Sequence, residues 1–163
     1  MRTMLSVIIV GIALVVGYVA YYVNTVGHAP AEWHIDPLRA VARTTPNTFY
    51  VGPSAFSTQE SRIPAPIYEA SPEVLAEAFD VFVMGQPKVE RIAGSVEQAH
   101  LSYVQRSETI GVPDVITVKF LPIEGTENST VAIYSRSRFG YGDLGVNEAR
   151  VTAWLNALSS FEP

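Results

Sequence analysis

An uninterrupted run of apolar and uncharged residues lies near the start of the chain, from Met4 to Val23. A helix rises about 1.5 Å per residue, so a run of this length spans about 30 Å, the thickness of the hydrocarbon core of a bilayer. Val, Ile and Leu make up more than half of the run, and each favours insertion at the centre of a membrane helix by about 0.3 to 0.6 kcal/mol. The pattern predicts a single transmembrane helix over residues 4–23.

A cleaved signal peptide is the alternative interpretation of this run, because Ala29-Pro30-Ala31 resembles a small-residue cleavage site. The apolar core of a signal peptide is usually about 7–15 residues long, which is shorter than this run. We therefore expect the segment to be retained as an anchor.

The flanks of the run indicate its orientation. Arg2 precedes it, and no Lys or Arg follows before Arg39. By the positive-inside rule the N-terminus faces the cytoplasm, and the C-terminal domain is periplasmic or otherwise extracytoplasmic, on an inner or plasma membrane. Toward and beyond the C-terminal end of the run, four aromatic residues suit the outer membrane–water interface: Tyr18, Tyr21, Tyr22 and Trp33.

A proline-bearing stretch without apolar periodicity then predicts a juxtamembrane linker over residues 24–44. Within it, Asp36 and Pro37 suit the cap and first position of a brief helix through Arg43. The remaining pattern predicts one α+β domain over residues 45–160.

Two helices are predicted in this domain. Ser71 suits an N-cap and Pro72 a first helical position, and apolar residues then recur at helical spacing until Gly85. Near the C-terminus, Asn147 would cap a helix that ends at Leu158 and has one apolar face.

Short strand-like stretches surround the first of these helices, and turn residues separate them. Short connections between consecutive strands favour an antiparallel meander. We expect a sheet of about four to five strands packed by two helices. The stretches are Thr48–Val51, Ile67–Ala70, Lys88–Ala93, Gln98–Ser107, Val115–Leu121 and Thr130–Arg138.

Charge and cysteine content exclude several classes of function. The net charge of −5 and the pI of about 5.1 argue against a nucleic-acid partner. The chain has no cysteine, which excludes disulfides, thiolate metal sites and cysteine nucleophiles.

The stretch from Gly140 to Gly145 matches the G-x-G-x-x-G pattern of dinucleotide sites. Such a site needs a further parallel strand with an acidic residue about twenty residues on, and the sequence stops at Pro163. We expect no cofactor here, and interpret the stretch as a glycine-bearing turn with Gly145 in it and with Asp143 and Asn147 as helix caps. A small anion at the helix N-terminus is an intermediate interpretation.

Side chains alternate between the two faces of a strand, so Tyr134, Arg136 and Arg138 share one face of their strand. In the strand at 98–107, His100 and Arg106 share a face, opposite Tyr103. If the strands are neighbours, their arginines converge with Arg150 to bind a phosphate or carboxylate. The alternative is that each arginine pairs with an acid of the domain, such as Asp114. The candidate anion-binding residues are Arg106, Arg136, Arg138, Arg150, Tyr103, Tyr134 and His100.

The sequence predicts neither a catalytic set nor a metal site. His100 is the one histidine of the predicted domain, and no acid–base partner for it is specified by spacing. His28 and His34 lie in the proline-bearing linker, which is a poor metal cage. The least favoured function class is a hydrolase or transferase built on His100, Tyr103, Arg106 and Arg136.

Three stretches resemble the signatures of a known family. They are Thr45–Val51, Ser102–Ser107 with Gly111–Asp114, and Tyr134–Arg138 with Asp143–Asn147 and Arg150. Together they are similar to the bacterial and plastid family called domain of unknown function 1499, over about residues 45–158. The resemblance implies no activity, cofactor or partner. A looser similarity, in strand and helix order, is to helix-grip, START-like folds, which clasp a hydrophobic ligand between a curved sheet and a helix.

These observations favour a membrane-anchored accessory or interaction module of a membrane or envelope complex, because an anchor is predicted and a catalytic set is not. The alternative is a binder of an anionic lipid or small amphiphile through an arginine-lined groove. The expected partners are the membrane through residues 4–23, a protein of a membrane complex and an anionic lipid.

Overall fold

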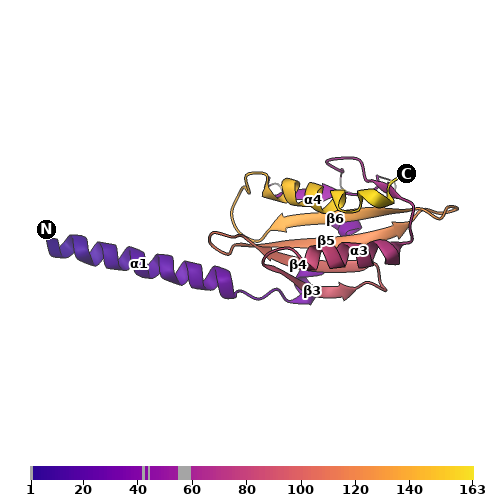
Figure 1. Cartoon of the computed structure of the whole chain (residues 1–163). Coiled ribbons are helices and arrows are strands. Elements are labelled where there is room, and N and C mark those ends of the chain that lie inside the picture. The colour runs from indigo at the N-terminus through magenta and orange to yellow at the C-terminus, as the bar shows by residue number, and fades with distance from the viewer. Residues whose placement is uncertain (1, 42, 44, 55–59) are drawn as a thin grey trace.

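A long helix, α1 (Arg2–Thr25), projects from one end of a domain that contains all the strands (Figure 1). In the part of the chain that the structure describes, α1 is the one helix long and apolar enough to cross a bilayer, and a signal sequence passes the same test. The residues described by this computed structural model are 2–41, 43, 45–54 and 60–163.

One antiparallel sheet forms the centre of the domain, with the order β1-β6-β5-β4-β3 and with β2 paired to β6. The last four strands follow one another as the predicted meander, which is confirmed. The described residues give six strands rather than four to five, because both early strands pair with β6. The strands are β1 (Thr48–Val51), β2 (Ile67–Tyr68), β3 (Val89–Ser95), β4 (His100–Arg106), β5 (Pro113–Pro122) and β6 (Ser129–Ser137).

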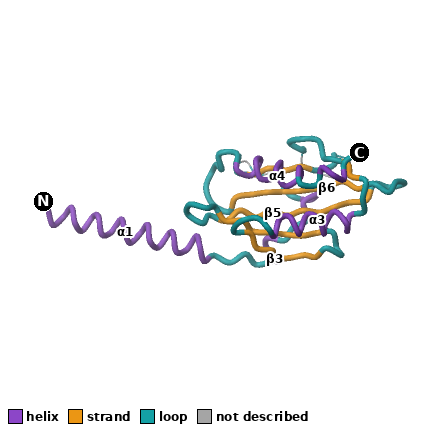
Figure 2. The backbone as a smooth tube through the Cα atoms, in the orientation of Figure 1, coloured by secondary structure: helices purple, strands orange, loops and turns teal. Residues whose placement is uncertain are grey.

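Two helices, α3 (Pro72–Met84) and α4 (Val146–Asn156), cover the same face of the sheet (Figures 1 and 2). As predicted, α3 begins after Ser71, whose Oγ accepts a hydrogen bond from the Val74 N–H at 3.4 Å. The main core lies between this face and the helices, and the rings of Phe79, Tyr103 and Trp154 meet edge-on in it. The predicted α+β class is confirmed.

The expectation that Asn147 caps the last helix is wrong. Helix α4 begins two residues earlier, with Gly145 at the N-cap position and a φ of 81°, a left-handed conformation that favours glycine. The side chain of Asn147 is instead buried beneath the helix. The helix proper ends at Asn156, short of Leu158, because a 3-10 turn, η2 (Ser159–Phe161), follows.

The stretch predicted as a linker lies along the other face of the sheet. It forms two short turns, α2 (Pro30–Trp33) and η1 (Pro37–Arg39). Asp36 caps η1 as expected, accepting a hydrogen bond from the Leu38 N–H at 3.0 Å, but the turn ends at Arg39 rather than at Arg43.

Trp33 anchors this stretch, which we call the docked segment (Val26–Ala40). It packs against Val104 and Val115 and is 6% exposed, so the expectation that Trp33 lies at the membrane interface is wrong. Ala40 packs against Tyr50 and Tyr134 further along the same face. The sheet therefore has a core on both sides.

Candidate functional site

Three of the candidate arginines lie on the sheet face that the docked segment covers. In β6, Ser135 points toward α4, so its neighbours Tyr134 and Arg136 point the other way. Arg106 and Arg138 reach the same segment from the ends of β4 and β6. These three arginines are thus brought together, as the alternation of the two strands predicted.

Arg136 is held by the docked segment itself. Its guanidinium donates a hydrogen bond to the Trp33 carbonyl at 3.2 Å and lies 4.7 Å from the centre of the Trp33 ring. The ring of Tyr134 lies 5.6 Å away on the strand. Contact with two aromatic rings suits a planar cation, so Arg136 binds Trp33 rather than an external anion.

Arg106 and Arg138 bind the chain where helix α1 ends. Arg106 donates to the carbonyls of Val23 at 2.8 Å and Val26 at 3.3 Å, and Arg138 donates to that of Gly27 at 2.7 Å. The last carbonyls of a helix have no partner within the helix, and they carry the negative end of its dipole. Arg106 therefore caps α1 through the Val23 carbonyl, and Arg138 binds the chain two residues after α1 ends.

Two further contacts join α1 to loops of the domain. The Asn24 amide donates to the Ile110 carbonyl at 3.0 Å, in the loop between β4 and β5. The Tyr22 and Phe139 rings meet edge-on with centres 6.1 Å apart. Residues from β4 to the start of α4 thus surround the last turn of α1.

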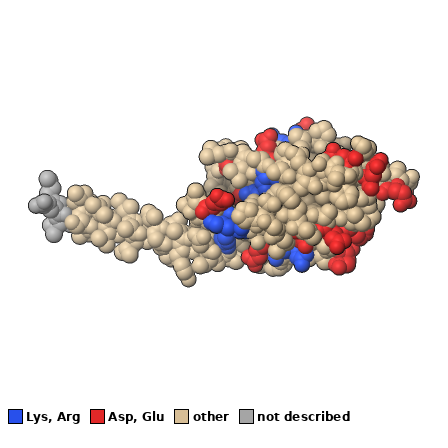
Figure 3. Space-filling view, in the orientation of Figure 1, with Lys and Arg blue, Asp and Glu red and all other residues tan. Residues whose placement is uncertain are grey.

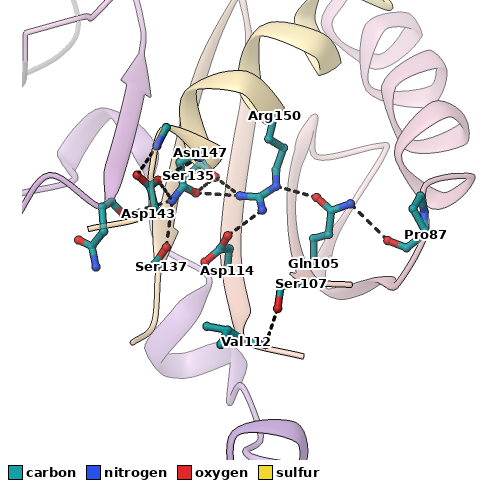
Figure 4. A network of polar contacts seen from close by, with 12 residues as sticks. Pro87, Gln105, Ser107, Val112, Asp114, Ser135, Ser137, Asp143, Asn147 and Arg150 are labelled. Carbon is teal, nitrogen blue, oxygen red and sulfur yellow. Dashed lines mark hydrogen bonds and ion pairs between the residues drawn. The ribbon is translucent and has the colours of Figure 1, made fainter. Parts of the chain in front are cut away.

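Arg150 does not join the other three arginines, and the expected convergence of all four is wrong. It lies on α4, across the sheet, and pairs with Asp114 at 2.7 Å (Figure 4). Its other nitrogens donate to Gln105, Ser135 and Asn147. The alternative that arginines pair within the domain holds for Arg150, which binds α4 to β4, β5 and β6.

Asn147 and Asp143 complete this buried network. The Asn147 amide donates to the Asn47 carbonyl at 3.2 Å and to Ser137 at 3.1 Å, which joins α4 to β1 and β6. The Asp143 carboxylate accepts from the N–H groups of Gly145 and Asn147, so Asp143 caps α4. Burial opposes ionisation of Asp143, but these hydrogen bonds outweigh it and lower the pKa of its carboxyl.

The two candidate tyrosines lie on opposite faces. Tyr103 is in the main core, and its hydroxyl donates to Asp80 at 2.9 Å. Burial and that carboxylate raise the pKa of Tyr103. Tyr134 lies under the docked segment, where burial raises its pKa as well. Together they cannot contact one ligand.

His100 binds the docked segment. Its ring stacks on that of His34 with centres 4.0 Å apart, and its Nε2 lies 3.1 Å from the Ile35 carbonyl. His34 Nδ1 in turn lies 2.8 Å from Ser102 Oγ. Burial, and then the neighbouring His34, lower the pKa of His100. Among the described residues no group of three or more His, Cys, Asp or Glu could hold a metal ion.

The space between the sheet and α4 is filled by side chains. Val151, Trp154 and Leu155 pack there against Ile116 and Ile133, all of them buried. An acyl chain would have to displace this core. A hollow of about 600 Å³ lies instead between β1 and the start of α4, and among the described residues Arg62 is the one arginine that lines it.

Taken together, the fold and its contacts define a class: an α+β domain docked on the end of a helix of membrane-spanning length. The chain belongs to the family described as "Protein of unknown function (DUF1499)", whose model matches residues 40–158. The resemblance drawn from the three signature stretches is thereby confirmed. A search of the curated proteins gives no match to the chain.

The sequence did not point to the partners of Arg106, Arg136 and Arg138, because five of these partners are backbone carbonyls. They belong to Val23, Val26, Gly27, Trp33 and Gly111. Trp33 was the one residue of the sequence that could have indicated this contact. A tryptophan in a polar, proline-bearing stretch indicates a buried contact as readily as an interfacial one.

Proposed function

We propose that this protein is a single-pass, membrane-anchored accessory module whose extracytoplasmic domain is held against its own anchor in a fixed orientation. The observation that carries the proposal is the binding of the end of α1 by Arg106 and Arg138. A domain on a free tether would not need these contacts.

The same contacts support retention of α1 over cleavage as a signal peptide. Cleavage after Ala31 would remove Val23, Val26 and Gly27, and so leave Arg106 and Arg138 without these acceptors. A leader that is discarded contributes nothing to the mature fold, whereas this one supplies part of it.

Several features favour an interaction module over an enzyme. His100, Tyr103 and Arg150 each bind groups within the protein, and Tyr103 lies across the sheet from His100. Positive charge gathers near the anchor, whereas the far end of the face in Figure 3 is mainly acidic. A domain polarised in this way and fixed at a membrane suits a docking role beside a membrane complex.

Retention and orientation are tested with single cysteines, because the natural chain has none. Thr152→Cys on the exposed side of α4 should react with a membrane-impermeant maleimide in intact cells, and Thr3→Cys should react only after lysis. Both should stay in the membrane fraction at about the full 17.8 kDa. A shortened, soluble product would contradict the proposal, as would the opposite labelling pattern.

The accessory role is tested on the tagged full chain at its native level of expression. After mild detergent extraction it should sediment in an assembly larger than the chain in its micelle. Arg106→Gln with Arg138→Gln should weaken that assembly, and Arg91→Gln, whose side chain pairs with Asp80 on α3, should not. Sedimentation as a lone chain in every detergent would contradict the role.

Binding of an anionic lipid is a second candidate, and one observation favours it. In the described part of the chain, Arg106 and Arg138 have no carboxylate within ion-pair distance. Phosphate oxygens of the outer leaflet could supply that charge at the end of α1. Full chain in phosphatidylglycerol vesicles should then be more stable than in phosphatidylcholine vesicles, and equal stability would exclude this candidate.

A further inference from the structure

The end of the domain next to α1 exposes apolar side chains that its core does not use. Leu144 is fully exposed, and Tyr141 and Ile110 are largely exposed, at 73% and 65%. They lie on two loops, residues 107–112 and residues 139–146, which we call the anchor-side rim. Single exposed apolar residues are ordinary on a protein surface, but a group at one end indicates a contact surface.

Contacts with α1 place this rim at the level of its last turn. The loop at 107–112 accepts the hydrogen bond from Asn24, and Phe139 in the other loop meets Tyr22. Figure 1 shows this end of the domain, at which β4 and β6 end and β5 begins. A bilayer crossed by α1 would therefore begin within a turn of the rim.

The backbone holds Leu144 outward. Its φ is 55°, a left-handed value that is uncommon for any residue with a side chain. The Asp143 carboxylate fixes this conformation by accepting hydrogen bonds from the N–H groups of Gly145 and Asn147, on the far side of Leu144. A leucine that is strained and also fully exposed serves no purpose in the packing of the domain.

The two loops also form one continuous surface. A hollow of about 300 Å³ lies between them, and Ile110, Phe139, Leu144 and Val146 are among its lining residues. Tyr141, beside the hollow, has the amphipathic ring that settles at the level of lipid headgroups.

From this arrangement we propose that the anchor-side rim enters the headgroup layer of the leaflet from which α1 emerges, with Leu144, Tyr141 and Ile110 in contact with lipid. The bilayer is the occupant that fits, because the rim is continuous with the end of the helix proposed to cross it. The inference rests on the proposed anchorage through α1. The membrane contact would then consist of the helix together with the two loops.

The test uses the full chain with a nitroxide label on one cysteine at a time, in phosphatidylcholine vesicles. Leu144→Cys and Tyr141→Cys report on the rim. Val81→Cys is the matched control, a similarly exposed apolar residue (72%) on α3, and Val16→Cys reports on the anchor. Collision of each label with oxygen, which concentrates in lipid, and with a nickel chelate, which stays in water, gives its depth.

Lipid-like collision rates at Leu144 and Tyr141, with water-like rates at Val81, are the expected result. Water-like rates at Leu144 and Tyr141, with Val16 in lipid, would overturn the rim contact and leave the anchorage standing. Water-like rates at Val16 would overturn the anchorage itself. Protection of Leu144 from both reagents would mean that a second copy of the chain covers the rim, which also overturns the proposal.

Discussion

The arginines of this domain illustrate how one residue type serves two environments. Arg150 uses its fork of donors on a carboxylate, an amide and a hydroxyl, all from side chains. Arg136 instead uses its planar face, against the Trp33 ring. A lysine could replace neither, because an ammonium has no fixed fork and no plane.

Replacing Arg150 tests the buried network. The side chains of Arg150 and Asp114 are only 7% and 10% exposed, so Arg150→Met should leave Asp114 buried and unpaired. The free energy of unfolding in detergent should fall by about 3–5 kcal/mol, as is typical when one partner of a buried pair is removed. Urea denaturation measures this loss.

The ion pair between Arg91 and Asp80 provides the matched control. The side chain of Arg91 is 41% exposed, and Arg91→Ala should cost less than about 1 kcal/mol. Adding Asp114→Asn to Arg150→Met should recover part of the lost stability. Equal losses for the two arginines would contradict a structural role for Arg150.

Leu144 offers a second test at this scale. A left-handed conformation costs a residue with a side chain roughly 1–2 kcal/mol, so Leu144→Gly should raise the free energy of unfolding by about 1 kcal/mol in detergent. Leu144→Ala keeps the conformation and removes only exposed surface, so it should leave stability nearly unchanged. A loss of stability in Leu144→Gly would mean that the side chain packs within the domain.

The residue patterns predicted which face of a strand each side chain lies on, but not which group it binds. Alternation along β6 correctly grouped Arg136 with Arg138, because side chains of a strand alternate whatever lies around them. Arg150 was wrongly added to the group, because the position of a helix above or below a sheet is not written in its own sequence.

At the scale of elements, local signals identified most of the fold. Ser71 and Pro72 marked the start of α3, and turn residues separated the four meander strands at nearly their observed ends. The pairing of β1 with β6 was not predictable, because it joins residues such as Tyr50 and Tyr134 that are far apart in sequence. Local propensity carries no information about such a partner.

The docked segment is the element that sequence patterns described least well. It was expected as a linker, because Ala29 to Pro37 has neither strand nor helix periodicity. Individual side chains, chiefly those of Trp33 and His34, hold it on the sheet. It has no repeated apolar face that a sequence pattern could reveal.

Acid should weaken this docking. Burial lowers the pKa of His34 and His100 in the docked state, and burial with the nearby Arg138 and Arg106 lowers that of His28 to about 4. A histidine whose pKa is lower in the docked state stabilises docking when the pH is above its undocked pKa of about 6.5. This stabilisation is lost as the pH falls toward the pKa of the docked state. Asp36 and Glu32 act in the opposite sense on these histidines, but do not outweigh burial.

Trp33 reports this change when Trp154→Phe removes the other tryptophan. Between pH 7 and pH 4 the emission of Trp33 should shift to the red as the ring becomes exposed to water. His34→Gln with His100→Gln should reduce the shift. Emission that is independent of pH over this range would show that the histidines do not control docking.

At the scale of the whole molecule, helix α1 and the domain form one connected structure. The family match covers residues 40–158, so α1 and nearly all of the docked segment lie outside it. The arginines that bind them lie inside it. We infer that the domain supplies a cationic and aromatic surface on which this chain places its own membrane-proximal segment.

The distance between anchor and domain tests this account most directly. Nitroxide labels at Val19→Cys on α1 and Val81→Cys on α3 can be measured by pulsed electron resonance on the full chain in vesicles. The account predicts one narrow distance distribution, which broadens when Arg106→Gln and Arg138→Gln are introduced and does not change with Arg91→Gln. A broad distribution in the otherwise unchanged protein would contradict the central claim, because it would mean that the domain moves freely on its anchor.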